Sequence, residues 1–444
     1  MLATPEIIRT LQRKLYTKAK QEPGYRFYAL YDKVWRADVL AHAYHLVRAN
    51  KGSPGVDGMS FEDVAQKIGV ETFLLELAQD LKDKSYQPSA VRRVMIPKAD
   101  GSMRPLGIPT IRDRVAQMAV KLIIEPIFEA DFCPNSYGFR PKKSAHDAVD
   151  EIAKSLVCGY TNVIDADLSK YFDSIPHAKL LAVVAERIVD SAILHIIKLW
   201  LKAPVIGEDQ DGTKRNVGGG KGNSIGTPQG GVISPLLANC YLHLLDRIWA
   251  RHRLERKLGA RLIRYADDFV VLCKGNVDVP MARIRHVLDR LDLSLNEAKT
   301  HIVDARQDSF NFLGFEFKMS KSERTGKRFP YVSPAPKSLA KIKQRVKELT
   351  GRKRTLIPLK DLVGSVNASL RGWSNYFHYR HSSAAMKKVK THTEERLRIH
   401  LMKRHKVSDR GTGLLRFPTR QLYDRYGLYK VPLKAGWKSA HASV

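Results

Sequence analysis

Cysteine is scarce in this chain of 444 residues, which has only four, and no two of them form a Cys-x-x-Cys pair. A disulfide framework and a zinc ribbon both need closely spaced cysteines, so the sequence predicts neither. Long apolar runs are also missing: no stretch approaches the roughly 18 apolar residues of a membrane span, and the N-terminus lacks a signal-peptide pattern. We therefore expect a protein of a reducing compartment with no membrane partner.

Acidic residues are scarce in the last third of the chain. From Lys321 to Val444 there are 30 Lys and Arg residues against seven Asp and Glu, whereas the whole chain has 76 against 45 and a net charge of +31. Charge concentrated in this way predicts a polyanionic partner held mainly by the C-terminal region. Aromatic residues are interleaved with the charges, and they could stack on bases or fill a helical core. These are Trp373, Tyr376, Phe377 and Tyr379.

Two adjacent aspartates interrupt an apolar part of the chain. Asp267 and Asp268 follow Leu262-Ile263 and precede the apolar run 269–272, a pattern that predicts two buried strands joined by a tight hairpin. Adjacent carboxylates at a hairpin tip repel each other unless positive charge lies near them. A divalent metal ion is the simplest source of that charge. An isolated Asp-Asp pair is usually only a solvated turn, so this interpretation needs a second motif.

The second motif is an acidic strand that the sequence predicts at 162–168. Asp165 and Asp167 alternate there with apolar residues, so both carboxylates share one face of the strand. Two metal ions held about 3.5–4 Å apart need carboxylates from more than one strand. The pattern alone leaves open which of the two aspartates supplies the ligand.

The ordered motifs of the chain resemble those of bacterial group II intron reverse transcriptase/maturases. The resemblance rests first on Tyr-Ala-Asp-Asp at 265–268, Asp-Leu-Ser-Lys-Tyr-Phe-Asp at 167–173 and Thr-Pro-Gln-Gly-Gly-Val-Ile-Ser-Pro-Leu-Leu-Ala-Asn at 227–239. Further matches are Gly-Val-Asp-Gly at 55–58, Ile-Pro-Lys at 96–98, Arg-Pro-Leu-Gly-Ile-Pro at 104–109, Tyr-Gly-Phe-Arg-Pro at 137–141, Leu-Asn-Glu-Ala-Lys-Thr at 295–300, Phe-Leu-Gly-Phe at 312–315 and Arg-Gly-Trp-Ser-Asn-Tyr-Phe at 371–377. The resemblance covers residues 35–435, and such an ordered series is far more specific than any single motif.

The resemblance implies an α+β right-hand polymerase with fingers, a palm built on an antiparallel sheet with its catalytic hairpin, and a helical thumb. The length of the chain fits two or three domains. The expected order is an N-terminal extension and the start of the fingers over 1–90, fingers over 91–160, a palm over 161–330 with a Gly-rich loop insertion at 205–225, a helical thumb or maturase domain over 331–400, and a basic nucleic-acid-binding segment over 401–444.

The resemblance also assigns roles to single residues. It makes Asp167, Asp267 and Asp268 the catalytic carboxylates that bind two Mg²⁺ ions, and it leaves Asp165 a structural role. The residues expected to bind the incoming nucleotide are Lys98, Arg104, Phe172, Gln229 and Lys299. Arg and Lys suit a triphosphate because they offer it a donor fork and a compact positive charge. Asp173 is expected to cap the helix that follows it.

The implied function is RNA-directed DNA synthesis from dNTPs on an RNA template with a DNA or RNA primer. A second implied role is to bind the group II intron RNA, to assist its splicing, and to copy it into target DNA during retrohoming. Since no cysteine follows Cys273, we do not expect the cysteine-containing nuclease of longer relatives, and primers would come from elsewhere, such as replication forks. The implied location is the bacterial cytoplasm, at the nucleoid when DNA is the target. No pattern indicates an oligomeric state.

Other functions are compatible with the same motifs. A reverse transcriptase recruited by its host for defence or DNA repair would carry them too. A splicing-only RNA-binding cofactor with a decayed polymerase site is opposed by the intact carboxylates and nucleotide-binding residues. An RNA polymerase is opposed by Phe172.

Phe172 lies five residues after Asp167, where the resemblance places a bulky ring against the sugar of the incoming nucleotide. The ring would exclude a 2′-hydroxyl by steric clash. We therefore expect Phe172→Ala to raise ribonucleotide incorporation by about tenfold or more, measured as the ratio of rNTP to dNTP use in primer extension. Unchanged discrimination against ribonucleotides would remove the assignment.

Overall fold

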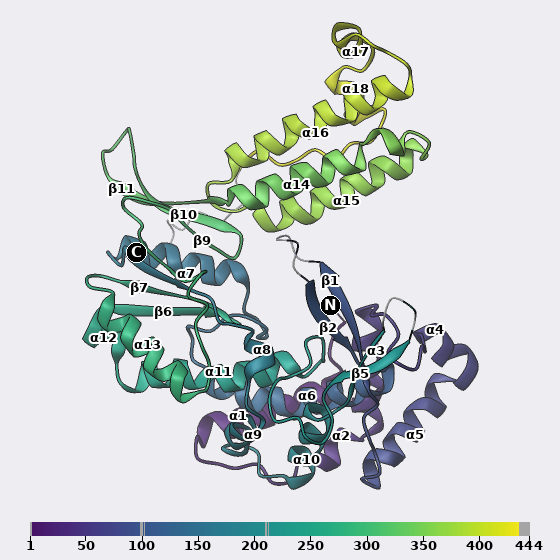
Figure 1. Ribbon diagram of the computed structural model, residues 1–444, viewed down its shortest axis with the longest axis vertical. Helices are drawn as coiled ribbons and strands as arrows, with labels where there is room; N and C mark the ends of the chain where they lie inside the picture. Colours follow the sequence, from purple (N-terminus) through teal and green to yellow (C-terminus); the bar gives the residue numbers. More distant parts are fainter. Residues whose placement is uncertain (1, 98–100, 102, 209–210, 212, 435–444) are drawn as a thin grey trace. The chain divides into compact units, whose positions relative to one another are not determined.

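The computed structural model describes residues 2–97, 101, 103–208, 211 and 213–434 (Figure 1). The chain divides into two compact units. The first comprises Met1–Ala148, Ala166–Val271 and Asn276–His301, and the second Val149–Asp165, Leu272–Gly275 and Ile302–Val444. Each unit contains helices and strands, in agreement with the predicted α+β class. All four cysteines are free, and no helix in the described part of the chain is long and apolar enough to span a membrane.

The first unit is organised around the long helix α6 (Ile111–Asp131), most of whose residues are buried. Helices α1 (Glu6–Gln21) and α3 (Ala37–Ala49) both pack on it. At its start, Thr110 Oγ1 accepts a hydrogen bond from the backbone N–H of Asp113, which satisfies one of the free donors of the first turn. The remaining helices are α2 (Tyr31–Val34), α4 (Phe61–Asp63), the π-helix η1 (Val64–Ile68), α5 (Val70–Lys82), α8 (Tyr171–Ser174), α9 (His177–Ala185), α10 (Ser191–Leu201), α11 (Ser234–Arg251), α12 (Leu254–Leu258) and α13 (Asp278–Arg290).

A four-stranded sheet in this unit has the order β2-β1-β4-β5. Its strands are β1 (Val91–Pro97), β2 (Met103–Ile108), β4 (Val205–Glu208) and β5 (Lys214–Gly218). Strand β1 pairs antiparallel with β2 and parallel with β4, and β4 pairs antiparallel with β5.

The predicted loop insertion at 205–225 is therefore wrong for its first half, which forms β4 and β5. Val205 and Ile206 pair with the N-terminal end of β1, where the backbone N–H of Val91 donates to the carbonyl of Pro204 at 2.7 Å. The pairing satisfies backbone groups of β1 that would otherwise lie at a sheet edge. Because the segment is rich in glycine, its composition favoured a loop, and the two short strands were not predicted.

The predicted carboxylate hairpin is confirmed. Strands β6 (Ala260–Tyr265) and β7 (Asp268–Cys273) are neighbours, and the turn between them is tight, with Ala266 in the left-handed region at φ +58°. Strand β3 (Asn162–Ala166) ends one residue before Asp167. Strand β8 (His301–Asp304) is its neighbour.

The second unit combines a small sheet with a bundle of helices. The sheet has the order β11-β10-β9 and is antiparallel, with β9 (Phe310–Phe312), β10 (Phe315–Lys321) and β11 (Arg328–Pro334). The helices are α7 (Ala145–Val157, most of which belongs to this unit), α14 (Pro336–Leu349), the short 3₁₀ helix η2 (Arg352–Arg354), α15 (Leu359–Phe377), α16 (Ser383–Arg404), α17 (Arg410–Arg416) and α18 (Thr419–Asp424). Helix α14 packs against both α15 and α16.

The predicted separation of a C-terminal segment at residue 401 is wrong. Helix α16 runs through this position to Arg404, and the core of the bundle includes residues on both sides of it. Leu397 and Leu401 are fully buried in that core together with Phe417, Leu422 and Val431. The basic composition of 401–444 concealed these apolar side chains, which make at least the part up to Val431 a component of the bundle.

The interleaved aromatic residues belong to the core of the second unit. Trp373 and Phe377 pack against the apolar cluster. The Tyr376 hydroxyl donates to the carbonyl of Leu313 at 2.9 Å, and the Tyr379 hydroxyl donates to Asp150 Oδ2 at 2.6 Å. Of the two uses left open by the sequence, core packing describes Trp373 and Phe377, while the two tyrosines use their hydroxyls in hydrogen bonds within the unit.

If residues beyond 401 are part of the bundle core, Leu422→Ala should destabilise it strongly. Removing a fully buried leucine side chain costs about 2–5 kcal/mol. The matched control is Leu415→Ala, at a leucine that is 84% exposed, and it should leave the free energy of unfolding almost unchanged. Urea denaturation followed by circular dichroism measures both, and equal effects would contradict the assignment.

Candidate active site

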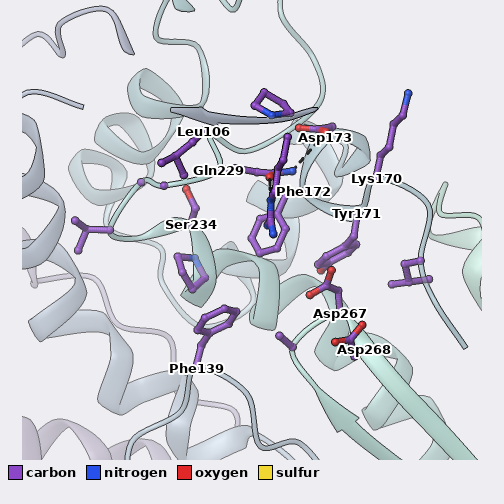
Figure 2. Close-up of a pocket in the computed structure, with 18 of the residues that line it drawn as sticks. Leu106, Phe139, Lys170, Tyr171, Phe172, Asp173, Gln229, Ser234, Asp267 and Asp268 are labelled. Atoms are coloured by element: carbon purple, nitrogen blue, oxygen red, sulfur yellow. Dashed lines mark hydrogen bonds between the residues drawn. The ribbon is translucent and has the colours of Figure 1, made fainter. Parts of the chain in front are cut away.

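A cavity of about 1240 Å³ in the first unit is lined by residues from several separate parts of the chain (Figure 2). They include β2, the segment 167–173, the segment 229–235, the carboxylate hairpin and the loop after α13, together with residues of α3, α6 and Phe139. Seven of the eight predicted site residues line it: Arg104, Asp167, Phe172, Gln229, Asp267, Asp268 and Lys299. The eighth, Lys98, lies outside the described residues. The fold therefore brings the predicted site residues together, and their individual roles stay predictions.

Asp167 is held by two donors from the loop after α13. Asn296 Nδ2 and Lys299 Nζ both contact its Oδ2 at 3.3 Å, and the backbone N–H of Asn296 donates to the carbonyl of Asp167 at 2.8 Å. The amide and the ammonium fix the position of the carboxylate. Asn296 was not predicted, although it lies in the matched motif at 295–300.

Asp267 and Asp268 differ in their surroundings. Asp267 is partly buried, whereas Asp268 is exposed at the start of β7. Burial raises the pKa of the Asp267 carboxyl, and the negative charge of Asp167 raises it further, while Arg104 and Arg264 act in the opposite direction. The two carboxylates are thus close enough to repel each other, and positive charge between them would be stabilising.

The hairpin turn is anchored from behind by Arg264, whose side chain is fully buried. Its guanidinium forms an ion pair with the equally buried Asp246 and donates to Asn239 Oδ1 at 2.9 Å. Its Nη1 also donates to the carbonyl of Ala266 at 2.8 Å. One arginine therefore fixes the turn residue that precedes the two aspartates.

Gly138 packs directly on the same turn. A side chain at this position would place its Cβ 2.3 Å from the backbone nitrogen of Ala266, so only glycine fits. The carbonyl of Gly138 accepts a hydrogen bond from Asn239 Nδ2 at 2.7 Å. Sequence analysis missed this support, although one signal was present: Arg264 interrupts an apolar strand, where a buried charge must find a partner.

Gln229 connects the sheet β2-β1-β4-β5 with α8. Its Oε1 accepts a hydrogen bond from Arg104 Nε at 2.8 Å, and its Nε2 lies 3.5 Å from Asp173 Oδ2. Its carbonyl accepts from the backbone N–H of Gly107 on β2 at 2.6 Å. Gly230 follows at φ +112°, where a Cβ would meet the carbonyl oxygen of Gly107 at 2.2 Å. The absence of a side chain at Gly230 therefore allows its backbone to lie close to β2.

The prediction that Asp173 caps the next helix is wrong. The N-cap residue of α9 is Pro176, and Asp173 belongs to the separate short helix α8. Its carboxylate instead faces the amide of Gln229, as the dashed line in Figure 2 shows. Local sequence could not reveal this contact, because the two residues are far apart in the chain.

Phe172 is only 8% exposed, and it lines the cavity beside Gln229 (Figure 2). Its carbonyl accepts from the backbone N–H of Thr227 at 2.7 Å. The ring of Tyr171 packs on it edge to face, with ring centroids 5.6 Å apart, and the Tyr171 hydroxyl donates to the carbonyl of Ala238. These contacts position the backbone of Phe172 and support one side of its ring.

Two family models match the chain. The first, reverse transcriptase (RNA-dependent DNA polymerase), matches residues 96–317, which is half of the chain and includes every predicted site residue. The chain belongs to the reverse transcriptase family. Its enzymatic activity is RNA-directed DNA polymerisation, and its cavity residues come from the matched region. The second model, the group II intron, maturase-specific domain, matches residues 339–417. This reverse transcriptase therefore carries a maturase domain, and the match extends beyond residue 401 as the bundle core does.

Curated relatives agree with this assignment. Protein YkfC of Escherichia coli K12 is 37% identical over 369 residues, which cover 75% of this chain and 94% of YkfC. The group II intron-encoded protein LtrA of Lactococcus lactis is 30% identical over 399 residues, covering 76% of this chain and 62% of LtrA. A solved telomerase from Candida albicans has 12% sequence identity and a TM-score of 0.42, covering 78% of this chain and 65% of that one. At that level the structural similarity carries no argument.

If Arg264 anchors the turn that carries Asp267 and Asp268, its replacement should affect stability and activity in separable ways. Arg264→Met leaves Asp246 charged and unpaired in the core and should cost about 3–5 kcal/mol in the free energy of unfolding. The double variant Arg264→Met/Asp246→Leu removes both charges and should recover much of that loss. Primer extension should stay impaired in both variants, because the bond to the Ala266 carbonyl is gone. Arg256→Met, at an exposed position of α12, is the control, and recovery of activity in the double variant would contradict the anchoring role.

Proposed function

We propose that this reverse transcriptase copies a group II intron RNA into DNA by two-metal nucleotidyl transfer, and that it assists splicing of the intron and its retrohoming into target DNA. The observation that carries the polymerase mechanism is the shared cavity. The three proposed metal ligands, Asp167, Asp267 and Asp268, line it together with Arg104 and Gln229, so that candidate metal ligands and a candidate triphosphate-binding cation face one space. Reverse transcriptases generally use divalent metals, and the side chains of this cavity suit them.

The donor set fits Mg²⁺. Mg²⁺ is usually held by one or two carboxylates together with substrate phosphates and water, rather than by a complete protein cage. Within the described ranges, no group of three or more His, Cys, Asp and Glu side chains forms a ready metal site, so Asp167, Asp267 and Asp268 would complete their coordination with the substrate. The raised pKa of Asp267 supports this, because a cation would relieve the repulsion that causes part of it. When bound, two Mg²⁺ ions would polarise the primer hydroxyl and neutralise triphosphate charge.

The remaining side chains bind and orient the nucleotide. Gln229 holds Arg104 through Nε, so that the two terminal NH₂ groups of the guanidinium can form a fork to phosphate oxygens. Lys98 is expected to add a second cation. Lys299 contacts Asp167, and it would add positive charge near the phosphates. Phe172 would lie against the sugar and select dNTPs.

Intron binding is proposed for the second unit. Its helices α14–α16 and the segment between them carry exposed cations, which suits a backbone-directed grip on RNA. They are Lys337, Lys341, Arg345, Lys347, Arg352, Lys353, Lys360, Lys387, Lys388 and Lys403. The match to the maturase-specific domain over 339–417 favours intron RNA as the polyanion. Splicing assistance and retrohoming follow from that binding as parts of the same proposal.

Primer extension on an RNA template with Mg²⁺ and dNTPs tests the polymerase mechanism. We expect wild type to make full-length cDNA and Asp267→Asn to lose at least about a thousandfold in rate, because a carboxylate ligand is replaced by a neutral amide of the same shape. Asp289→Asn, at an exposed position of α13, is the matched control and should retain activity.

Folding of the inactive variant is checked in metal-free buffer. Burial and Asp167 raise the pKa of Asp267, so its ionised form destabilises the folded protein at pH values above that pKa. Asp267→Asn removes this cost, and its melting temperature should be no lower than that of wild type at pH 7. Product from both proteins would show that the catalytic carboxylate is misplaced. No extension by a folded wild type that binds intron RNA would favour the splicing-only cofactor, and intron binding no tighter than binding to an unrelated RNA would favour a host-recruited role.

A further inference from the structure

Phe139 has an unusual environment for a phenylalanine. All fifteen phenylalanines of the chain lie in described parts, and Phe139, at 52%, is the only one among them that is exposed. It lines the polymerase cavity, and Figure 2 shows its ring at the side of that cavity. Core packing therefore does not explain this aromatic side chain, and none of the roles assigned above uses it.

The backbone of Phe139 is strained. Its φ is +56°, in the left-handed region that glycine adopts readily and that a bulky residue rarely occupies. A glycine or asparagine would be more stable at such a turn position. Strain of this kind persists where the surrounding structure enforces it, and it concentrates at functional sites.

The residues on both sides of Phe139 enforce the conformation. Before it, the backbone N–H of Tyr137 donates to the carbonyl of Arg264 at 2.9 Å, and Gly138 is clamped between Asn239 and the hairpin turn. After it, Arg140 Nη1 donates to the carbonyls of Cys133 and Ser136, each at 2.7 Å. Arg140 also forms an ion pair with Glu129 at 3.0 Å, and its side chain is only 6% exposed. The ring thus projects from a rigid support.

The position of this support indicates what the ring contacts. Gly138 packs on the backbone of Tyr265 and Ala266, so Phe139 belongs to the side of the cavity formed by the carboxylate hairpin. The proposed triphosphate-binding residues Arg104 and Gln229 come from β2 and the segment after residue 226. An exposed aromatic ring offers a flat surface that any base or sugar can pack on, without sequence preference.

Resting on the proposed polymerase function, we propose that Phe139 is a substrate-contacting residue whose ring packs against a nucleotide in the cavity, namely the end of the primer–template duplex. The ring would pack on the flat face of a base or sugar. Both the primer–template duplex and the incoming dNTP offer such a face, and the experiment below distinguishes these two ligands. The strained turn is the means by which the fold holds the ring out of the core and toward the substrate.

The test measures binding separately from catalysis. A fluorescent RNA–DNA primer–template is titrated with Phe139→Ala, Phe139→Tyr and wild type, and its dissociation constant is read by anisotropy without dNTPs. We expect about a tenfold higher dissociation constant for Phe139→Ala and a near-normal value for Phe139→Tyr, which restores a ring. Tyr28→Ala removes an aromatic residue that is 69% exposed and does not line the cavity, and it should change nothing.

A matched pair of variants separates contact from folding. Phe139→Ala and Phe139→Gly remove the same ring, but only glycine relieves the left-handed strain. The glycine variant should therefore melt about 2 °C higher than the alanine variant, with the same loss of duplex binding. If Phe139 had only a structural role, the glycine variant, which recovers stability, would also recover duplex binding.

The outcomes are distinct. A raised dissociation constant for the duplex supports the proposal as stated. If the duplex affinity is unchanged but the KM for dNTPs in primer extension rises, the Phe139 ring packs against the incoming nucleotide and not against the duplex. If neither quantity changes while Phe139→Ala remains folded, the proposal is overturned. A wild type that binds the duplex without extending it would contradict the polymerase function and leave the binding result for Phe139 valid.

Discussion

The candidate active site depends on one buried ion pair. Arg264 and Asp246 are both inaccessible to solvent, and through Arg264 the pair holds the carbonyl of Ala266. A buried charge pair of this kind contributes little net stability, because desolvation offsets most of its attraction. Its effect is geometric, because the contacts of the guanidinium hold the turn that carries Asp267 and Asp268.

The same buried contacts also position the segment around Gly138, which packs against the turn. Asn239 connects the guanidinium of Arg264 with the carbonyl of Gly138, and the absence of a side chain at Gly138 allows the two backbones to touch. The aspartates and the exposed ring of Phe139 are therefore positioned by one set of contacts. Rigid support of this type lets a polymerase site tolerate carboxylate repulsion and local strain that an isolated hairpin would relax.

The two units differ in how their charged side chains are arranged. In the first, a few charges are matched individually, as in Lys299 and Asn296 on Asp167, and Gln229 on Arg104. In the second, many exposed cations are available to the proposed RNA partner, and the aromatic side chains between them pack in the core of the bundle. Individually paired charges suit a reaction at one phosphorus atom. Positive charge spread over a surface suits a long RNA, because it attracts every phosphate of the backbone equally.

The sequence by itself determined the family, the α+β class, the carboxylate hairpin and a set of site residues that the fold brings to one cavity, because each of these is written in short, ordered motifs. Only the tertiary structure decided the rest. It placed β4 and β5 in one sheet with β1 and β2, and it paired Asp173 with Gln229 instead of making Asp173 a helix cap. It also extended the bundle core past residue 401 and exposed Phe139 on a strained turn. These features depend on contacts between residues far apart in the chain. Local periodicity and composition carry no information about such pairings, and the burial and pairing of a side chain become defined only when the distant partner is in place.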